Sequence, residues 1–315
     1  MNEDIPSAAP QPAAPATAAP KGSPKALAMA AAGRAHWIPF ALWLGVMFAV
    51  QIFHLSNVAE VHEHNSIVPG LCLVSQGWAY ALRVALAVAA LAVLRPWRHY
   101  ERPSARNILP AALVGIGVFL LWIGFETAFM KSALPSLAEL YERWCVLPIG
   151  KPREPADLVL LEAIEGVTPN IAGLAGQYFP ANAQIPFGYA AATKSLSPFD
   201  PASCGWGLTL VRLLGSAFVI AVIEEFFWRG FLYRWIQSLD FLDIDPGKLH
   251  LGAFIGVAAI FGAEHREWLA GVVTGILYAL LYIRTRDIWA ACTAHVTTNL
   301  LLGVYVLATR NYLYW

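Results

Sequence analysis

The stretch Ala221–Gly230 reads AVIEEFFWRG and directly follows an apolar run that has the composition of a membrane span. It places two adjacent carboxylates, Glu224 and Glu225, at the end of that run, with Arg229 four residues after the second. An ionisable group in hydrocarbon is unfavourable by several kcal/mol unless it is paired or neutralised, so such groups are expected to have a function. The stretch therefore predicts a functional site within a membrane-embedded helix.

The composition of the whole chain is that of a polytopic membrane protein. Of its 315 residues, 58% are hydrophobic and 13% are charged, about half the charged fraction of a soluble domain. The 12 Trp and 11 Tyr are residue types that often lie at the level of lipid headgroups. The formal net charge of zero argues against nucleic acid as a partner, because phosphate binding needs an excess of Lys and Arg. We predict an all-α fold, a transmembrane helical bundle of about seven or eight spans.

Seven apolar runs are candidate spans. They are Trp37–Phe53, Gly77–Leu94, Ile108–Met130, Leu208–Phe227, Leu249–Ala263, Trp268–Ile283 and Ile288–Ala308. The fifth and sixth runs are shorter than the roughly 20 residues that cross about 30 Å of hydrocarbon, so we expect them to be tilted or not fully spanning. A weak helical pattern near Leu158–Ile164 is a candidate for an eighth, amphipathic helix.

Composition also divides the chain into four segments. Residues 1–32 are Ala- and Pro-rich with few large apolar side chains, which predicts a disordered tail. Residues 33–130 hold the N-terminal spans, residues 131–205 form an extramembrane segment, and residues 206–315 form a C-terminal transmembrane core. Cys145 and Cys204 share the extramembrane segment, where an oxidising compartment would allow a disulfide between them.

The positions of Lys and Arg predict the orientation. Basic residues are concentrated in the tail and in the connections after the second, fourth and sixth spans, whereas the connections on the other side hold few. Because cytoplasmic connections carry the excess of Lys and Arg, we expect a cytoplasmic N-terminus. Residues 131–205 then face away from the cytoplasm.

The helical period separates the two carboxylates of the first motif. Glu225 and Arg229 are four residues apart and share a helical face, so we expect them to neutralise each other. Glu224 is rotated by about 100° from that face and is left without a partner. Glu224 is therefore the candidate for chemistry, and Arg229 holds Glu225. Whether Glu225 also takes part stays open.

Two further motifs lie in the last spans. In FGAEH, Phe261 and His265 are four residues apart, and in HVTTN the same spacing separates His295 and Asn299. A single histidine in a span is more often a hydrogen-bonded structural residue than a catalyst, so neither motif is strong alone. Together with a free Glu, they supply a base, a partner that orients it, and donors for a developing oxyanion.

The depths of these motifs conflict. His295 is expected about two turns from the cytoplasmic end of its span, and His265 near the opposite end of the fifth span. Either the fifth span is tilted or re-entrant, with the site in a water-filled hollow, or the span boundaries are wrong.

The order EExxxRG, FxxxH and HxxxN, with the connecting text GILYALLYIRTRDIWAACTAHVTTNLLLG, resembles the CPBP family of intramembrane proteases. That family includes the type II CAAX prenyl proteases and the bacterial Abi and bacteriocin-processing proteins. The resemblance covers Val211–Leu302. More narrowly, EEFFWRGFLYRW and the ending GVYVLATRNYLYW are similar to a bacterial branch of CAAX prenyl protease-related proteins associated with exosortase sorting systems.

The resemblance implies an intramembrane endopeptidase of the bacterial inner membrane, with residues 206–315 as its catalytic core and a peptide or protein in the lipid bilayer as its substrate. By motif, Glu224 activates a water for attack on a peptide carbonyl and His265 assists. His295 and Asn299 stabilise the oxyanion. The supporting residues are Glu225, Arg229 and Phe261. The narrower resemblance adds exosortase components as partners.

A metal is the alternative for the same residues. Two histidines and a carboxylate with open positions also hold zinc in hydrolases, which makes Glu224, His265 and His295 alternative zinc ligands. We favour a site with no metal or other cofactor, because Asn299 is a poor zinc ligand and a good oxyanion donor.

Two other functions compete with proteolysis. A non-catalytic immunity or assembly factor of a sorting system would use the same fold as a binding surface, although degraded motifs would be expected there and these motifs are complete. A transporter or proton pathway would use the buried Glu and His, but the two halves of the chain show no inverted repeat.

Overall fold

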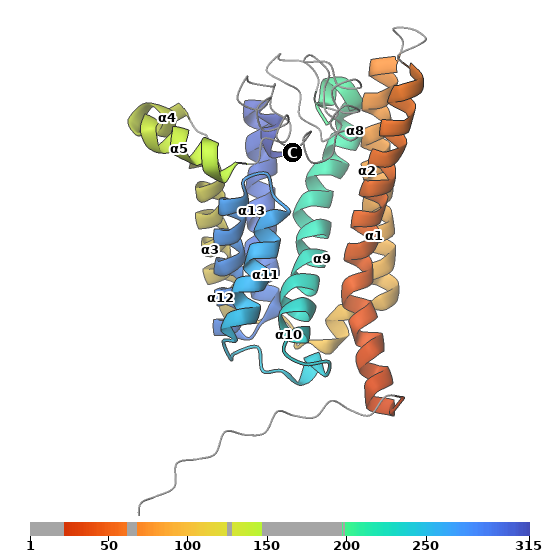
Figure 1. Cartoon of the computed structure of the whole chain (residues 1–315), viewed down its shortest axis with the longest axis vertical. Helices are drawn as coiled ribbons and strands as arrows, with labels where there is room; N and C mark the ends of the chain where they lie inside the picture. The colour runs from red at the N-terminus through yellow and green to blue at the C-terminus, as the bar shows by residue number, and fades with distance from the viewer. Residues whose placement is uncertain (1–21, 62–67, 125–127, 147–196, 198) are drawn as a thin grey trace, which may run out of the picture.

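The computed structural model describes residues 22–61, 68–124, 128–146, 197 and 199–315 (Figure 1). Within these ranges the chain is helical and has no β-strand, which confirms the all-α fold. The α-helices are α1 (Pro24–Val61), α2 (Val68–Leu94), α3 (Ala105–Gly124), α4 (Ala128–Ala133), α5 (Pro135–Cys145), α8 (Pro201–Leu214), α9 (Ala221–Glu225), α10 (Tyr233–Trp235), α11 (Leu251–Ala263), α12 (Trp268–Thr285) and α13 (Ile288–Thr309).

Five helical stretches of the described residues are long and apolar enough to cross a membrane, by length and composition. They are Gln76–His99, Ala105–Gly124, Cys204–Trp235, Trp268–Thr285 and Ile288–Thr309. The predicted fifth span is the shorter apolar helix α11, of 13 residues. The first predicted span lies within α1, a helix of 38 residues. The third predicted span is described as α3 up to Gly124 and again from Ala128, with residues 125–127 outside the described residues.

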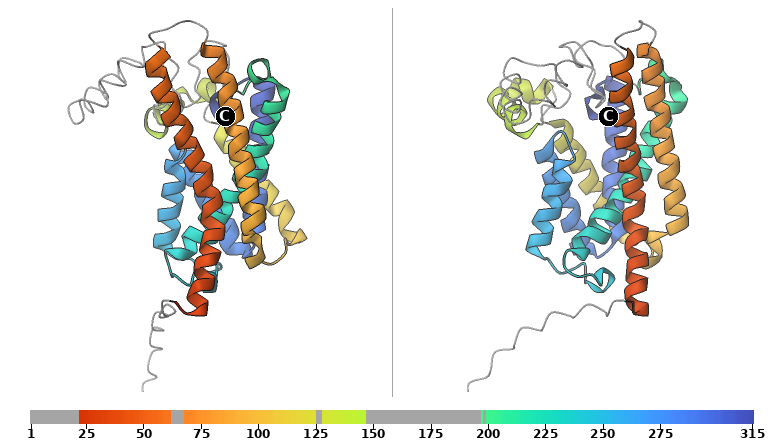
Figure 2. Two further views of the ribbon diagram at one scale, coloured as in Figure 1. Left: turned by 90° about the vertical axis from the view of Figure 1, so that its right-hand side faces the viewer. Right: turned by 45° about the vertical axis from the view of Figure 1, so that its right-hand side comes forward.

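The helices pack as two groups around a central one. α1 and α2 form an antiparallel pair that contacts α8, while α3, α11, α12 and α13 lie on the other side (Figures 1 and 2). The central column runs from α8 through η2 (Gly215–Ile220), α9 and η3 (Phe226–Leu232) to α10. It therefore carries the sequence AVIEEFFWRG through the middle of the bundle.

Helices occupy parts of two segments that were divided by composition. The tail predicted for residues 1–32 is helical from Pro24, because the Ala-rich run after it has a high helix propensity and continues into α1; residues 1–21 lie outside the described residues. The extramembrane segment predicted for residues 131–205 contains α5, and its last residues already belong to α8. The helical pattern near Leu158–Ile164 lies outside the described residues.

Cys145 and Cys204 are both free thiols in the structure. The disulfide proposed between them from their shared segment is therefore not formed. Each lies in its own helix, Cys145 at the end of α5 and Cys204 near the start of α8.

Glycines set the close approach of α11 and α12. A Cβ on Gly262 would lie 2.7 Å from the carbonyl oxygen of Trp268 and 2.8 Å from the backbone nitrogen of Val272. Both neighbours are backbone atoms, which cannot move aside without separating the helices. The pair is thus held at a distance that only a glycine permits.

We expect Gly262→Ala to destabilise the protein by about 1–3 kcal/mol, since the added methyl forces α11 away from α12. The measurement is the thermal unfolding midpoint of the purified protein in detergent. Gly256→Ala is the matched control on the same helix, because a Cβ there meets no atom within 4 Å. Equal midpoints for the two variants would contradict the close packing described.

Candidate active site

The two carboxylates of the first motif occupy α9, a short α-helical stretch between two π-helical segments, η2 and η3. A π-helical turn shifts the hydrogen-bond ladder from i→i+4 to i→i+5 and is frequent at functional sites. Both side chains point into the bundle. Glu225 is fully buried and Glu224 is 13% exposed.

Glu225 holds two partners from different parts of the chain. Its Oε1 accepts a hydrogen bond from Nη1 of Arg229 at 2.9 Å, as the spacing predicts. The same oxygen lies 2.8 Å from Nδ1 of His295, which is 70 residues away in sequence. The carboxylate thus links the central column to α13, which the motif alone did not reveal.

Arg229 is anchored on three sides, and its side chain is 1% exposed. Beyond the bond to Glu225, its Nη2 donates to the carbonyl oxygen of Gly275 in α12 at 3.2 Å. Its guanidinium also lies 4.6 Å from the ring centroid of Phe261. The structural role expected for Arg229 agrees with these contacts, and Phe261 supports it from α11.

His295 lies between the two carboxylates. Its Nδ1 is bonded to Glu225, and its Nε2 lies 3.8 Å from Oε2 of Glu224. The ring packs against Tyr278, at 5.2 Å between centroids. The hydroxyl of Tyr278 donates to Thr298 at 2.7 Å, which fixes that wall of the site from α12 and α13.

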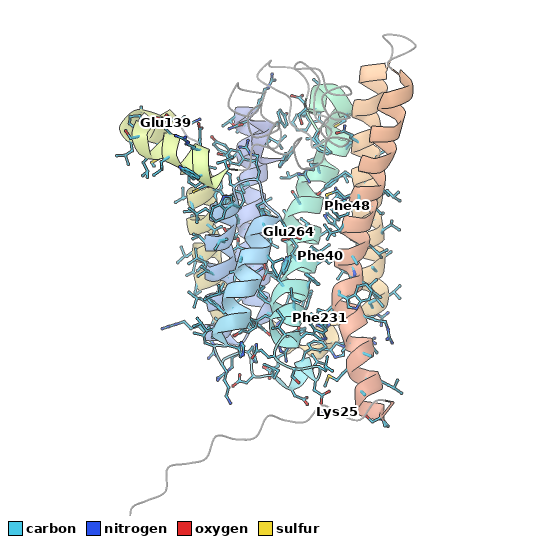
Figure 3. The ribbon with its side chains drawn as sticks, viewed as in Figure 1. Lys25, Phe40, Phe48, Glu139, Phe231 and Glu264 are labelled. Carbon is cyan, nitrogen blue, oxygen red and sulfur yellow. The ribbon has the colours of Figure 1, made fainter. Side chains whose placement is uncertain are left out.

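Oε2 of Glu224 is buried and has no hydrogen-bond partner among the described residues, and the same is true of Oε2 of Glu225. The titratable neighbour of Glu224 on α13 is His295, whose Nε2 lies 3.8 Å from that oxygen. A second carboxylate, Glu264, is near enough to interact electrostatically with Glu224. Figure 3 labels Glu264 next to the end of α11, on the side toward α9.

His265 reaches the same region because α11 is short. Thirteen helical residues rise only about 20 Å, so α11 ends part-way along the bundle (Figure 1), and His265 comes two residues after that end. The ring of Phe261 lies 4.8 Å from that of His265 and 6.1 Å from that of His295. The conflict of depths is thereby resolved: the fifth apolar helix ends part-way through the bundle.

The orientation of His265 follows from one hydrogen bond. Its Nδ1 lies 2.7 Å from the carbonyl oxygen of Phe261. Because a carbonyl only accepts, Nδ1 carries the hydrogen, and in the neutral ring Nε2 is then an acceptor. The edge of the ring packs on Trp122 of α3, at 5.3 Å between centroids.

Asn299 is turned toward the central column. Its Nδ2 donates to the carbonyl oxygen of Ser216 at 2.9 Å. Ser216 belongs to η2, and the bond ties α13 to this π-helical segment. One of the two amide hydrogens of Asn299 is thus engaged by backbone.

Three neighbours of the site were missed in the sequence. Glu264 stands within FGAEH itself, so the motif offered the signal for it. Trp122 and Tyr278 had no comparable signal, because an aromatic residue in an apolar span has the pattern of ordinary core. Trp122 also donates from Nε1 to Thr274 at 2.9 Å, which holds α3 against α12.

The structure does not gather the alternative zinc ligands Glu224, His265 and His295 into a metal cluster among the described residues. Over the residues that the structure describes, no three His, Cys, Asp or Glu side chains come together in a way that could hold an ion. Nδ1 of His265 and Nδ1 of His295 both have protein partners, which leaves Nε2 of each ring as the nitrogen that could face a ligand. We therefore derive no step through a metal.

Comparison with protein families matches residues 206–301 to the family described as type II CAAX prenyl endopeptidase, Rce1-like. The matched segment is less than half of the chain and contains all three motifs. No curated protein matches the chain, and no solved structure does. The match is to the broad family and does not extend to the exosortase-associated branch. Residues 206–301 are thus similar to the Rce1-like domain of type II CAAX prenyl endopeptidases, which supports a place for this segment in the CPBP family.

Proposed function

We propose that the protein hydrolyses its substrate with a water activated by Glu224, without a metal. The observation that carries this proposal is the contrast between the two carboxylates. Oε1 of Glu225 is occupied by both Arg229 and His295, whereas the buried Oε2 of Glu224 has no hydrogen-bond partner among the described residues and lies 3.8 Å from Nε2 of His295. A base needs such a free lone pair within reach of the water that it deprotonates.

The reaction then proceeds in two steps. Glu224 takes a proton from water while the water oxygen bonds to the peptide carbonyl carbon, which gives a tetrahedral oxyanion. The oxyanion collapses and breaks the C–N bond, and the proton on Glu224 passes to the leaving amine. Glu224 ends as a carboxylate, so the cycle closes without another reactant.

The histidines divide the remaining roles. Nε2 of His265 is an acceptor in the neutral ring, so it orients the water through the second hydrogen of that water. Nδ1 of His295 lies against Glu225, so Nε2 is the ring nitrogen through which His295 would face the oxyanion. The free amide hydrogen of Asn299 adds a second donor.

The substrate class we propose is a membrane-associated polypeptide of a sorting system. The support is the sequence similarity of Glu224–Trp235 and of the C-terminal residues to the exosortase-associated branch. On the same ground and on the distribution of basic residues, we propose a bacterial inner membrane location with a cytoplasmic N-terminus.

The test is cleavage of a quenched peptide panel by the purified protein in nanodiscs, with and without a strong chelator. We expect the cleavage rate to change less than about twofold on chelation, because the chemistry is routed through Glu224. Loss of activity that zinc restores would overturn the metal-free mechanism. Absence of cleavage over the panel, with Glu224→Gln still complementing a deletion in cells, would instead support the non-catalytic assembly factor.

A further inference from the structure

A second group of charged residues lies away from the active site, between α1, α2 and the start of the central column. The guanidinium of Arg83 stacks on Trp43, at 4.1 Å from the ring centroid. That of Arg212 lies 4.5 Å from the centroid of Tyr80, and Arg83 is 5.5 Å from the same ring. The ring of Phe199 lies beside that of Tyr80 and is 4.9 Å from the guanidinium of Arg212. We call these five residues the arginine–aromatic cluster.

The polar groups of the cluster lack partners. Nε of Arg83, Nε of Arg212 and the hydroxyl of Tyr80 are all buried without a hydrogen bond. Over the described part of the chain, no carboxylate forms an ion pair with either arginine, and the two guanidinium groups interact electrostatically with each other. Tyr80 is 2% exposed, so water does not readily satisfy its hydroxyl.

Unpaired guanidinium groups with buried donors are complementary to an oxyanion. Arginine binds phosphate and carboxylate with two parallel N–H groups, and the attraction is stronger where water is excluded. Aromatic rings hold each guanidinium in place without neutralising its charge. The cluster thus has two positive charges and at least three unsatisfied donors for one anionic group.

The surroundings of the cluster indicate where that anion comes from. Trp78 of α2 and Trp206 of α8 are 64% and 63% exposed, as expected of residues at the level of the headgroups. Arg83 follows Trp78 by five residues and Arg212 follows Trp206 by six. This separation is about 8–9 Å along each helix, so an arginine side chain can reach the headgroup level. Further along the same two helices the exposed apolar side chains include Leu82, Leu86, Leu210 and Leu214.

We propose that the arginine–aromatic cluster binds the phosphate of an anionic membrane lipid, with the acyl chains lying along the exposed leucines of α2 and α8. Two positive charges favour an anionic headgroup over a zwitterionic one, whose own cation would be repelled. The site is separate from the chemistry, because Arg212 precedes Glu224 by twelve residues, about 18 Å along the helix. Lipid binding would fasten the α1–α2 pair to the central column.

The test is native mass spectrometry of the full-length protein in detergent with phosphatidylglycerol or phosphatidylcholine added. We expect wild type to prefer phosphatidylglycerol, and Arg83→Gln/Arg212→Gln to bind it at least about tenfold more weakly. Arg95→Gln/Arg98→Gln is the matched control, since it removes the same charge from two exposed arginines, and it should leave the preference unchanged. Equal binding of the two lipids by wild type, or an equal loss in the control, would overturn the proposal.

A single variant and a competition experiment complete the test. Tyr80→Phe removes only the unpaired hydroxyl and retains the ring, so it serves if the double variant does not fold. We expect this variant to bind phosphatidylglycerol about threefold more weakly than wild type.

In the competition experiment, inorganic phosphate and a peptide with a free or amidated C-terminus are added as competitors of the lipid. Displacement of the lipid by phosphate alone at equal concentration would assign the site to free phosphate. A cluster-dependent preference for the free carboxylate, with lipid binding unchanged, would assign it to a peptide.

Discussion

Glu224→Gln is expected to lower kcat/KM for the cleaved peptide by about 10³-fold, the scale of a lost general base. Gln has nearly the shape of Glu but cannot take a proton from water. The side chain that it replaces is buried and makes no ion pair with Lys or Arg within the described residues, so folding should be unaffected. The measurement is steady-state cleavage in nanodiscs, accompanied by the thermal unfolding midpoint of each variant.

Glu264→Gln is the matched control for this variant, because it neutralises the carboxylate that interacts with Glu224 and leaves the base in place. We expect it to change kcat/KM by less than about tenfold, since it alters only the charge near the base. A reversal, with Glu264→Gln the more damaging of the two, would move the base from the first motif to the second.

Arg229→Met is expected to destabilise the protein by about 3–5 kcal/mol, the scale measured when one partner of a buried ion pair is removed. The variant leaves the carboxylate of Glu225, which is 0% exposed, without its arginine. It also removes the bond to the carbonyl oxygen of Gly275. Thermal unfolding in detergent and the yield of folded protein measure the effect.

The double variant Glu225→Gln/Arg229→Met separates charge from packing. If the unpaired carboxylate causes the loss, neutralising it should restore much of the stability of Arg229→Met. Activity should stay low, because His295 no longer has a carboxylate at Nδ1 to orient it. Should the double variant unfold as readily as the single one, the stacking of Arg229 on Phe261 would be the main contribution instead.

Local spacing was enough to predict several features. The apolar runs predict membrane helices because a span must satisfy its backbone internally and bury its length in hydrocarbon. The bond between Glu225 and Arg229 follows from their separation by one helical turn, which brings the side chains together even at the start of a π-helical segment. The freedom of Glu224 follows from the same period.

Contacts between distant segments required the tertiary structure. The hydrogen bond between His295 and Glu225 joins residues that lie 70 positions apart, so helical spacing cannot predict it. It holds a histidine and a carboxylate together at the site. The short rise of α11 brings His265 into the bundle, because the chain turns back before crossing it. Arg83 and Arg212 meet over Tyr80 only through the packing of α2 against α8. Periodicity predicts which residues share one face of a helix. It does not predict how deep in the bundle that face lies or which helix it contacts, because both depend on how the helices pack.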